Sequence, residues 1–174
     1  MSLKIITGCM FSGKTTEIFK ILSTLVSKNV LLINSNLDSR YDKNKIVSHD
    51  NQKIDCLSLS KLSDIPIDLY TKCEYIIIDE AQFFDDLYDF VTSSVDLNNK
   101  HIIVVGLNGD FNRKNFGDIY KLYPFADDIT LLKGKCQLCE NKSIFSKKMT
   151  NDASLIDIGS SDKYISVCRI CYNK

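Results

Sequence analysis

The 174-residue sequence lacks the features that mark several classes of protein. It has no net charge, because 22 acidic residues balance 22 basic ones, and so no electrostatic footprint indicates a nucleic acid or an anionic membrane as partner. No apolar run approaches the roughly 18 residues that a membrane span needs, and the N-terminus shows no signal-peptide pattern. We therefore expect a cytoplasmic protein without a membrane or nucleic-acid partner.

The cysteines do not form the pattern of a disulfide framework. Their number is seven, which is odd, and four of them have the spacing of metal ligands. We therefore expect reduced thiols in an intracellular compartment. Three cysteines are scattered and four form C-x-x-C pairs: Cys9, Cys56 and Cys73, then Cys136 with Cys139 and Cys168 with Cys171.

The most informative pattern that is present occupies residues 3–16. A short apolar, β-rich run leads into G-x-x-x-x-G-K-T, and a helical pattern follows at once, which is the context of a P-loop. Two glycines tolerate φ > 0, so the loop N–H groups can form an anion-binding nest at a helix N-terminus. A plain glycine turn is the alternative. The predicted phosphate-binding residues are Gly8, Cys9, Met10, Phe11, Ser12, Gly13, Lys14 and Thr15, with Lys14 on the β- and γ-phosphates and Thr15 on Mg²⁺.

Apolar runs alternate with amphipathic stretches along the first three quarters of the chain. A helix with one apolar face is expected from residue 15 until Asn29 ends it, and residues 87–95 give a second such face. Continuous apolar runs are typical of buried parallel strands. We expect these strands at residues 30–34, 75–78, 101–107 and 129–132, with a short helical stretch at 118–123.

An acidic pair ends the apolar run at residues 75–78. Asp79 stands at the Walker B position, where a carboxylate acts on Mg²⁺. Glu80 is one residue further, where a carboxylate can take a proton from an attacking group. The alternative is that the two carboxylates only cap the next helix, a role that we assign instead to Asp85 and Asp86.

Two polar loops could contribute to a site at the same edge of the sheet. Residues 107–117 follow a predicted strand and carry two aromatic residues and two cations, at the edge where open α/β sheets bind ligands. Phe111 is expected either to stack on a base or to fill the core. In the irregular segment 35–55, Arg40 is either a phosphate contact or a solvated charge, and His49 is expected to bond within its own loop.

The four paired cysteines predict a metal centre. Two C-x-x-C pairs, separated by 28 residues, supply four thiolates and leave no open position for water. This is the donor set of a structural, tetrahedral Zn²⁺ site. A dithiol redox pair is the alternative.

These motifs occur together and in this order in one known family. The P-loop, D-E-x-Q-F-F at residues 79–84, L-x-G-x-F-x-R-x-x-F-G at 107–117 and the ribbon closing with C-R-I-C-Y at 168–172 resemble the type II thymidine kinases over essentially the whole chain. Cys9 departs from that pattern, since the family usually has proline there. Ser160 stands where the clasping loop usually has a second glycine.

The resemblance implies the roles of further residues. It places the general base on Glu80, a nucleotide contact on Gln82, the base-stacking aromatic on Phe111, and Phe83 in the same pocket. It puts Asp50 near the metal with Asp79 and Thr15, and Ser146 near the thymine 5-methyl group. The thymidine-clasping loop would comprise Leu155, Ile156, Asp157, Ile158 and Gly159, with Tyr164 as a further substrate contact.

The resemblance also implies a fold and an activity. We expect a P-loop α/β domain with a parallel sheet over residues 1–133, and a small zinc-ribbon lasso domain over 134–174. ATP and thymidine would be the substrates, Mg²⁺ and structural Zn²⁺ the metals, and a homotetramer the assembly.

Two other classes of function are consistent with parts of the sequence. Residues 79–82 spell a helicase-like D-E-A-Q, which would suit a nucleic-acid-stimulated ATPase, but such motors need a second motor domain and a basic tract. The second class is a zinc-ribbon binding module that a bound nucleotide switches. Its GTPase form would need N-K-x-D, and the pairs Asn44-Lys45, Asn99-Lys100 and Asn141-Lys142 all lack the aspartate.

Overall fold

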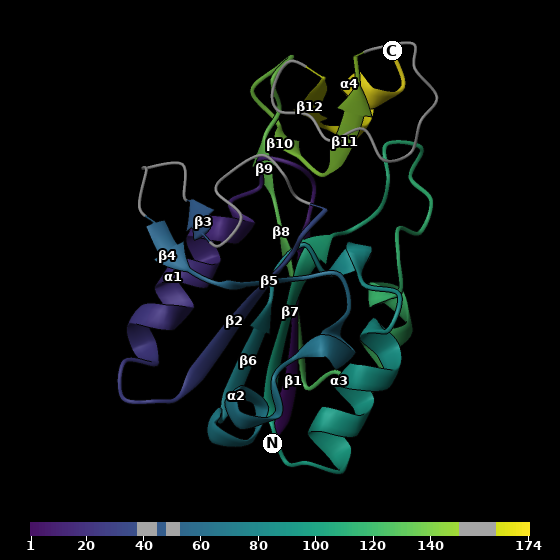
Figure 1. The fold of residues 1–174 in the computed structure, drawn as a ribbon. Coiled ribbons are helices and arrows are strands. Elements are labelled where there is room, and N and C mark those ends of the chain that lie inside the picture. Colours follow the sequence, from purple (N-terminus) through teal and green to yellow (C-terminus); the bar gives the residue numbers. More distant parts are fainter. Residues whose placement is uncertain (38–44, 48–52, 150–162) are drawn as a thin grey trace.

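A computed structural model describes residues 1–37, 45–47, 53–149 and 163–174. Its centre is a six-stranded sheet in the order β5-β2-β6-β7-β1-β8, and every strand pair in it is parallel (Figure 1). The predicted α/β fold is confirmed. The strands are β1 (Ser2–Gly8), β2 (Val30–Ser35), β5 (Leu57–Leu59), β6 (Tyr75–Ile78), β7 (His101–Leu107) and β8 (Asp128–Leu132).

Each face of the sheet packs against its own layer of apolar side chains, as alternation along buried strands requires. The helix α1 (Lys14–Thr24) covers one face and buries Ile18 there against Ile6 and Ile77. The other face packs against Leu87 and Val91. The elements on that face are η1 (Leu62–Asp64), α2 (Ile67–Lys72), α3 (Leu87–Asp96) and η3 (Ile119–Phe125), where η denotes a 3₁₀-helix.

The first helix is shorter than the apolar periodicity predicts. It ends at Thr24, not at Asn29, and Val26 beyond it is 85% exposed. Ser23 and Thr24 donate their hydroxyls to the carbonyls of Lys20 and Ile21, at 2.6 and 2.7 Å. Such bonds compete with the helical ladder, so the helix stops there although the apolar pattern continues.

The C-terminal part of the chain stands over the carboxyl ends of the strands (Figure 1). It contains short antiparallel pairs and a third apolar cluster, formed by Ile165 and Val167 with four cysteines. We call residues 134–148 and 163–174 the ribbon. Its elements are β9 (Gly134–Lys135), β10 (Lys142–Ser143), β11 (Phe145–Lys148), β12 (Tyr164–Val167) and α4 (Arg169–Tyr172). The domain boundary at residues 133 and 134 stays a prediction.

Two small elements complete the part of the chain that the structure describes. A short hairpin pairs β3 (Lys45–Val47) with β4 (Lys53–Asp55), and the turn η2 (Ala81–Phe83) follows the acidic pair. None of the helices in these described ranges combines the length and the apolarity that crossing a bilayer requires.

Candidate active site

The parallel sheet brings the P-loop and the acidic pair to one edge. Gly8, at the end of β1, is in register with Leu107 at the end of β7. The strand β6, which ends just before Asp79, is hydrogen-bonded to the other side of β7. The three strand ends therefore place the P-loop, the acidic pair and the 108–117 loop side by side, as predicted.

The two P-loop glycines are needed for different reasons. Gly13 has φ 87° and precedes the first residue of α1, so it occupies the left-handed conformation that we expected. Gly8 does not have a positive φ, which corrects the prediction for this residue. A Cβ on Gly8 would lie 2.3 Å from the Oγ of Ser12 and 2.9 Å from the carbonyl oxygen of Leu132. Close packing, not backbone freedom, requires glycine at position 8.

Lys14 is folded over the loop that precedes it. Its side chain is buried, and the ammonium donates to the carbonyl oxygens of Cys9 at 3.1 Å and Gly8 at 3.4 Å. A buried charge requires such partners. Ser12 Oγ is also buried, and it has no hydrogen-bond partner among the described residues. A buried cation and an unsatisfied hydroxyl in one loop fit the binding of an anion such as phosphate.

Asp79 and Glu80 differ in burial and in backbone conformation. Asp79 is buried, and its Oδ1 accepts the N–H of Glu80 at 2.9 Å. Glu80 is partly exposed and has φ 49° and ψ 41°, in the left-handed region that non-glycine residues rarely occupy. Strained residues of this kind cluster at active sites.

Gln82 connects the carboxylate of Glu80 to the sheet. Its Nε2 donates to Glu80 Oε2 at 2.6 Å, and its Oε1 accepts the N–H of Leu107 at 3.1 Å. The glutamine is buried, and a Cβ on Gly106 would lie 2.6 Å from its Oε1. The sequence predicted a nucleotide contact for Gln82, and the structure adds a direct role in holding Glu80.

The carboxylate of Asp86 does not cap the helix that follows it. Asp86 precedes α3, but its side chain makes no cap hydrogen bond there. It accepts instead from the backbone N–H groups of Leu62 at 3.1 Å and Ser63 at 2.9 Å, at the start of η1. Burial raises the pKa of Asp86, but these hydrogen bonds outweigh it and leave the pKa below its ordinary value. The capping role predicted for Asp86 therefore applies to η1, not to α3.

The four paired cysteines meet at one point of the ribbon. Their sulfur atoms all lie within 4.8 Å of one another, and Cys139 Sγ is 3.6 Å from the Sγ atoms of both Cys168 and Cys171. A disulfide would need about 2.0 Å, whereas Zn–S bonds of about 2.3 Å give tetrahedral edges of about 3.8 Å. All seven cysteines are free thiols. The four, Cys136, Cys139, Cys168 and Cys171, are positioned to bind zinc.

Their pKa values show that the protons are shared unevenly. Burial opposes ionisation of Cys136, but backbone N–H groups, first that of Cys168, outweigh it and lower its pKa to about 6. The side chain of Cys139, together with burial, raises the pKa of Cys171 to about 12. Because a metal binds thiolates, zinc binding at neutral pH must release protons from this cluster.

Comparison with known proteins assigns nearly the whole chain to one family. The family model described as thymidine kinase matches residues 1–172. The chain belongs to the thymidine kinase family. It is 44% identical to a thymidine kinase of Choristoneura fumiferana entomopoxvirus, over 100% of this chain and 97% of that protein. Identity to a fowlpox virus thymidine kinase is 40%, over 98% of this chain and 96% of that one.

A plant relative is longer. The chain is 38% identical to a thymidine kinase of rice, over 98% of this chain but only 65% of the rice protein. Members of this family are enzymes, so the P-loop, the acidic pair and the cysteine cluster belong to an enzyme, not to a passive binding module.

The aromatic residues predicted for the nucleoside form two pairs. The ring of Phe111 faces that of Tyr164, with centroids 6.3 Å apart, and Lys148 Nζ lies 5.3 Å from the Phe111 centroid. Phe83 meets Phe116 edge to face at 5.5 Å. Phe111 belongs to none of the apolar clusters of the described residues, so it does not fill the core.

The loop that carries Phe111 is shaped by a buried carboxylate that we did not predict. Oδ1 of Asp110 accepts the N–H groups of Asn112 at 2.9 Å and Lys114 at 2.7 Å. Aspartate commonly organises turns through such bonds. The exposure of Asp110 is only 8%, so this side chain fixes the path of the loop from inside.

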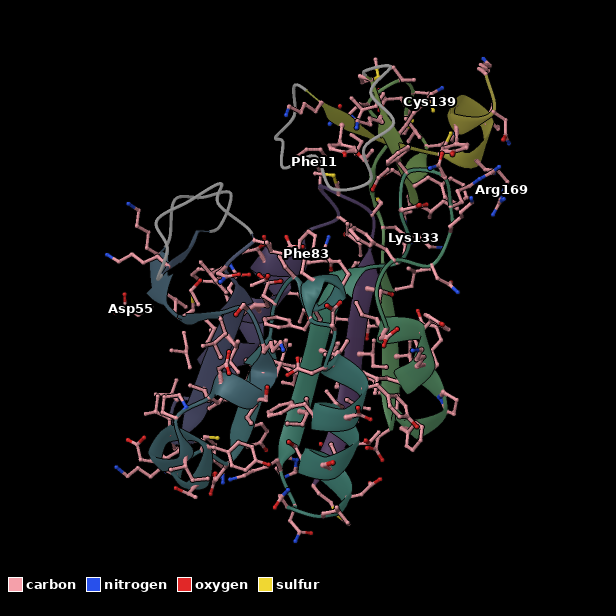
Figure 2. The ribbon with its side chains drawn as sticks, turned by 45° about the vertical axis from the view of Figure 1, so that its right-hand side comes forward. Phe11, Asp55, Phe83, Lys133, Cys139 and Arg169 are labelled. Carbon is pink, nitrogen blue, oxygen red and sulfur yellow. The ribbon has the colours of Figure 1, made fainter. Side chains whose placement is uncertain are left out.

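The ribbon touches the P-loop directly. Ser146 is buried, and its Oγ accepts the N–H of Met10 at 3.0 Å. Cys9 Sγ lies 3.6 Å from the Oγ of Ser143. Figure 2 shows Phe11 beneath the ribbon and Phe83 at the top of the sheet. Lys133 lies where the chain passes from the sheet to the ribbon. A cysteine in place of the usual proline thus joins the P-loop to the ribbon.

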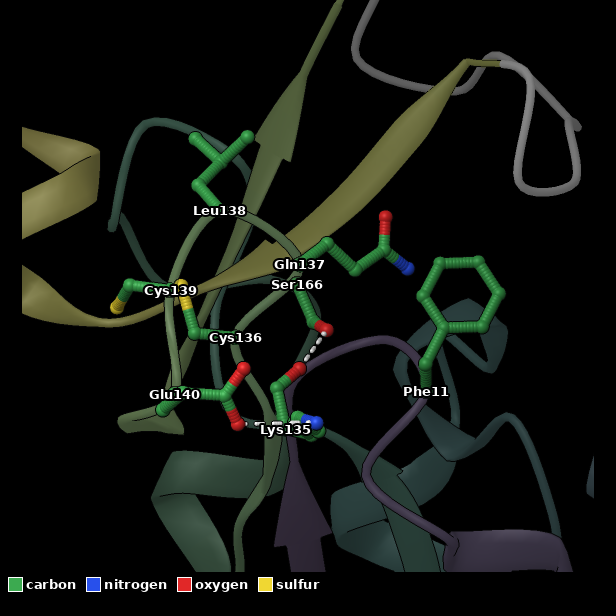
Figure 3. Close-up of a pocket in the computed structure, with 8 residues that line it drawn as sticks. All are labelled: Phe11, Lys135, Cys136, Gln137, Leu138, Cys139, Glu140 and Ser166. Carbon is green, nitrogen blue, oxygen red and sulfur yellow. Dashed lines mark hydrogen bonds and ion pairs between the residues drawn. The ribbon is translucent and has the colours of Figure 1, made fainter.

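A groove of about 580 Å³ opens between the P-loop tip and the first cysteine pair (Figure 3). Phe11, 45% exposed and with φ 60°, lies across it from Gln137. Ser166 Oγ donates to the carbonyl oxygen of Lys135 at 2.9 Å, and the largely exposed side chains of Lys135 and Glu140 form an ion pair at 3.1 Å. Lys14 is not among the residues that line the groove, which are Phe11, Lys135, Cys136, Gln137, Leu138, Cys139, Glu140 and Ser166.

Some predicted residues lie outside the part of the chain that the structure describes. These are Arg40, His49, Asp50, Leu155, Ile156, Asp157, Ile158 and Gly159.

Proposed function

We propose that the protein transfers the γ-phosphate of ATP to the 5′-hydroxyl of thymidine, giving dTMP and ADP. Membership of the family supports phosphorylation of thymidine. The observation that carries the finer assignment is the meeting of a P-loop and a hydrogen-bonded glutamate at one sheet edge, close to two aromatic pairs.

Each catalytic residue has one role in this proposal. Lys14 offsets charge on the transferring phosphoryl group, as a P-loop lysine does. Glu80 accepts the proton of the 5′-hydroxyl as that oxygen attacks phosphorus. Gln82 holds the carboxylate of Glu80 in position through its hydrogen bond. Positioning and charge stabilisation supply most of the acceleration in phosphoryl transfer.

The metals have separate places. Thr15 and Asp79 would hold Mg²⁺, which neutralises charge on the phosphates when bound. Zn²⁺ would occupy the four-cysteine cluster and act structurally, because four thiolates complete its coordination.

The nucleoside would lie between the ribbon and the sheet. Phe111 would stack on the pyrimidine, with Phe83 and Tyr164 around it, and Ser146 would face the 5-methyl group. A methyl contact contributes only about 1–3 kcal/mol of discrimination, so deoxyuridine should be a usable substrate with kcat/KM lower by about tenfold or more.

A panel of acceptors tests the proposal. Release of ADP from ATP is measured with Mg²⁺ and, in turn, thymidine, deoxyuridine, deoxyadenosine, deoxyguanosine, single-stranded DNA or no acceptor. We expect thymidine to be the best acceptor and the purine nucleosides to be inactive. Stimulation by DNA instead would favour a motor ATPase, and slow turnover indifferent to every acceptor would favour a nucleotide switch.

Three further expectations belong to the same proposal. Free thiols throughout support a reducing location such as the cytoplasm. The separate apolar cluster of the ribbon supports a domain boundary between residues 133 and 134. Assembly into a homotetramer rests on the resemblance, and light scattering on purified protein tests it.

A further inference from the structure

The C-terminal helix is bonded to the loop that carries Phe111. The hydroxyl of Tyr172, on α4, donates to the backbone carbonyl oxygen of Phe111 at 2.6 Å, across 61 residues of sequence. Tyr172 directly follows the cysteine Cys171 of the metal cluster. One oxygen atom therefore joins the helix of the cysteine cluster to the aromatic residue proposed to stack on the nucleoside.

A second contact joins the same two segments. The guanidinium of Arg113 lies 4.3 Å from the centroid of the Tyr172 ring and 5.6 Å from that of Phe145. Its Nη1 also donates to Oδ1 of Asn173 at 3.4 Å. Arginine over an aromatic ring is an attractive arrangement. The loop is thus held to α4 on both sides of Asn112.

The hydrogen bonds within the loop fix the residues after Phe111, whereas the carbonyl of Phe111 itself is bonded from outside the loop. Asp110 accepts from the N–H groups of Asn112 and Lys114 and so fixes the turn after Phe111. Within the described ranges, the donor to the Phe111 carbonyl is Tyr172. A carbonyl held in this way restrains the peptide plane that follows Phe111, and with it the backbone from which the ring projects.

We propose that Tyr172 is a positioning residue for the nucleoside: through the Phe111 carbonyl it fixes the ring of Phe111 opposite Tyr164. The inference rests on the proposed function in one respect, because it takes the ligand between the rings to be a nucleoside. Tyr172 does not touch that ligand. It lowers the cost of binding by ordering the aromatic residue beforehand.

The first test removes one oxygen atom. Tyr172→Phe keeps the ring under Arg113 and deletes the hydroxyl. We expect the KM for thymidine to rise about three- to tenfold, in line with loss of one hydrogen bond. The KM for ATP, kcat and the zinc content should stay within a factor of two of the wild type. Tyr120→Phe, the same change at an exposed tyrosine of η3, is the matched control and should change nothing.

The second test needs no substrate. The chain contains no tryptophan, so Phe111→Trp introduces a single fluorescent reporter at the site. Without ligand, its anisotropy should be lower in the Phe111→Trp, Tyr172→Phe double variant than in Phe111→Trp alone. Adding Tyr120→Phe to Phe111→Trp should leave the anisotropy unchanged.

The outcomes separate this inference from the proposed function. A lower anisotropy in the double variant supports the positioning role, even if the wild type proves not to phosphorylate thymidine. An unchanged anisotropy overturns it. So does a thymidine KM unaffected by Tyr172→Phe in active protein, or a rise in KM accompanied by loss of zinc, which would make the effect one of ribbon folding.

Discussion

The phosphate end and the nucleoside end of the site are held together by different means. At the phosphate end, Gly8 ends β1 and Asp79 follows β6, the two strands that flank β7 in a single parallel sheet, and Lys14 bonds to carbonyls five and six residues away. At the nucleoside end, Phe111 depends on Tyr172, and Ser146 reaches Met10 across 136 residues. One end is built by local backbone geometry, the other by side chains from distant segments.

This difference indicates which substitutions should affect each end of the site. A sheet edge persists as long as the core does, so changes at the phosphate end should affect chemistry without altering the shape of the site. The nucleoside end depends on the ribbon, whose apolar cluster is small and includes four cysteines. Small domains with few apolar residues commonly need a metal for stability. Perturbing the metal should therefore loosen one end more than the other.

The largest effect is expected at the phosphate end, from Lys14→Ala. No other residue of the P-loop motif carries a charge that can bridge the β- and γ-phosphates, so kcat should fall by at least about 10³-fold. Thymidine binding, measured by calorimetry, should persist. Lys20→Ala removes an exposed lysine from the same helix and should be silent. Loss of thymidine binding in Lys14→Ala would show that the two ends are not independent.

Glu80→Gln should have the next largest effect. The amide keeps the shape of the side chain but cannot accept a proton, so kcat should fall by about 10²–10⁴-fold. The KM for ATP should change little. Asp85→Asn, at an exposed neighbouring carboxylate, is the control. A Glu80→Gln enzyme with more than a third of the wild-type kcat would remove Glu80 from the role of base.

Cys168→Ser tests the nucleoside end. Loss of one ligand should release zinc and raise the KM for thymidine about tenfold or more. The KM for ATP should rise only about two- to threefold, because Ser146 and Ser143 touch the P-loop but do not build it. Zinc content is measured alongside both KM values, and Cys56→Ser, outside the cluster, is the control. Equal rises in both KM values would contradict the division into two ends.

The smallest effect concerns a residue outside both ends. Asp86→Ala removes the carboxylate that caps η1 and should lower the free energy of unfolding at pH 7 by about 0.5–2 kcal/mol. Because folding lowers the pKa of Asp86, its contribution is present at neutral pH and disappears as the pH falls through the folded-state value. Urea unfolding at several pH values measures this. Asp86→Asn, which keeps one acceptor, should show no such pH dependence, and both KM values should stay unchanged in either variant.

The same division decides how much the sequence could predict. The strands at residues 30–34, 75–78 and 101–107 follow from short patterns, because neighbours in sequence fix them. So does the placement of the candidate site residues Lys14, Asp79 and Glu80 just after strands of the sheet. The end of α1 was mispredicted, since serine and threonine bonds to the backbone interrupt an apolar pattern that continues beyond them.

The side chains that hold the nucleoside end could not be predicted in this way. Tyr172 closes the C-R-I-C-Y pattern and Asp110 lies in the 107–117 loop, but neither pattern shows what its side chain contacts, because the partners are defined only once the chain is folded. The reason why position 8 requires glycine could not be predicted either. The atoms that exclude a side chain there include the carbonyl oxygen of Leu132, on a strand far along the chain. Motifs report local geometry, and contacts between distant segments do not leave such a signal.

The left-handed backbone of Glu80 has a consequence for how this protein can change over evolutionary time. Holding a glutamate at φ 49° costs about 1–2 kcal/mol relative to a residue that accepts this region, such as glycine or asparagine. Selection for thermal tolerance alone would therefore favour replacement of Glu80. Asparagine or glycine at position 80 should therefore make the protein more stable, and if the carboxylate is the base, less active, which is the trade-off expected at a strained functional residue.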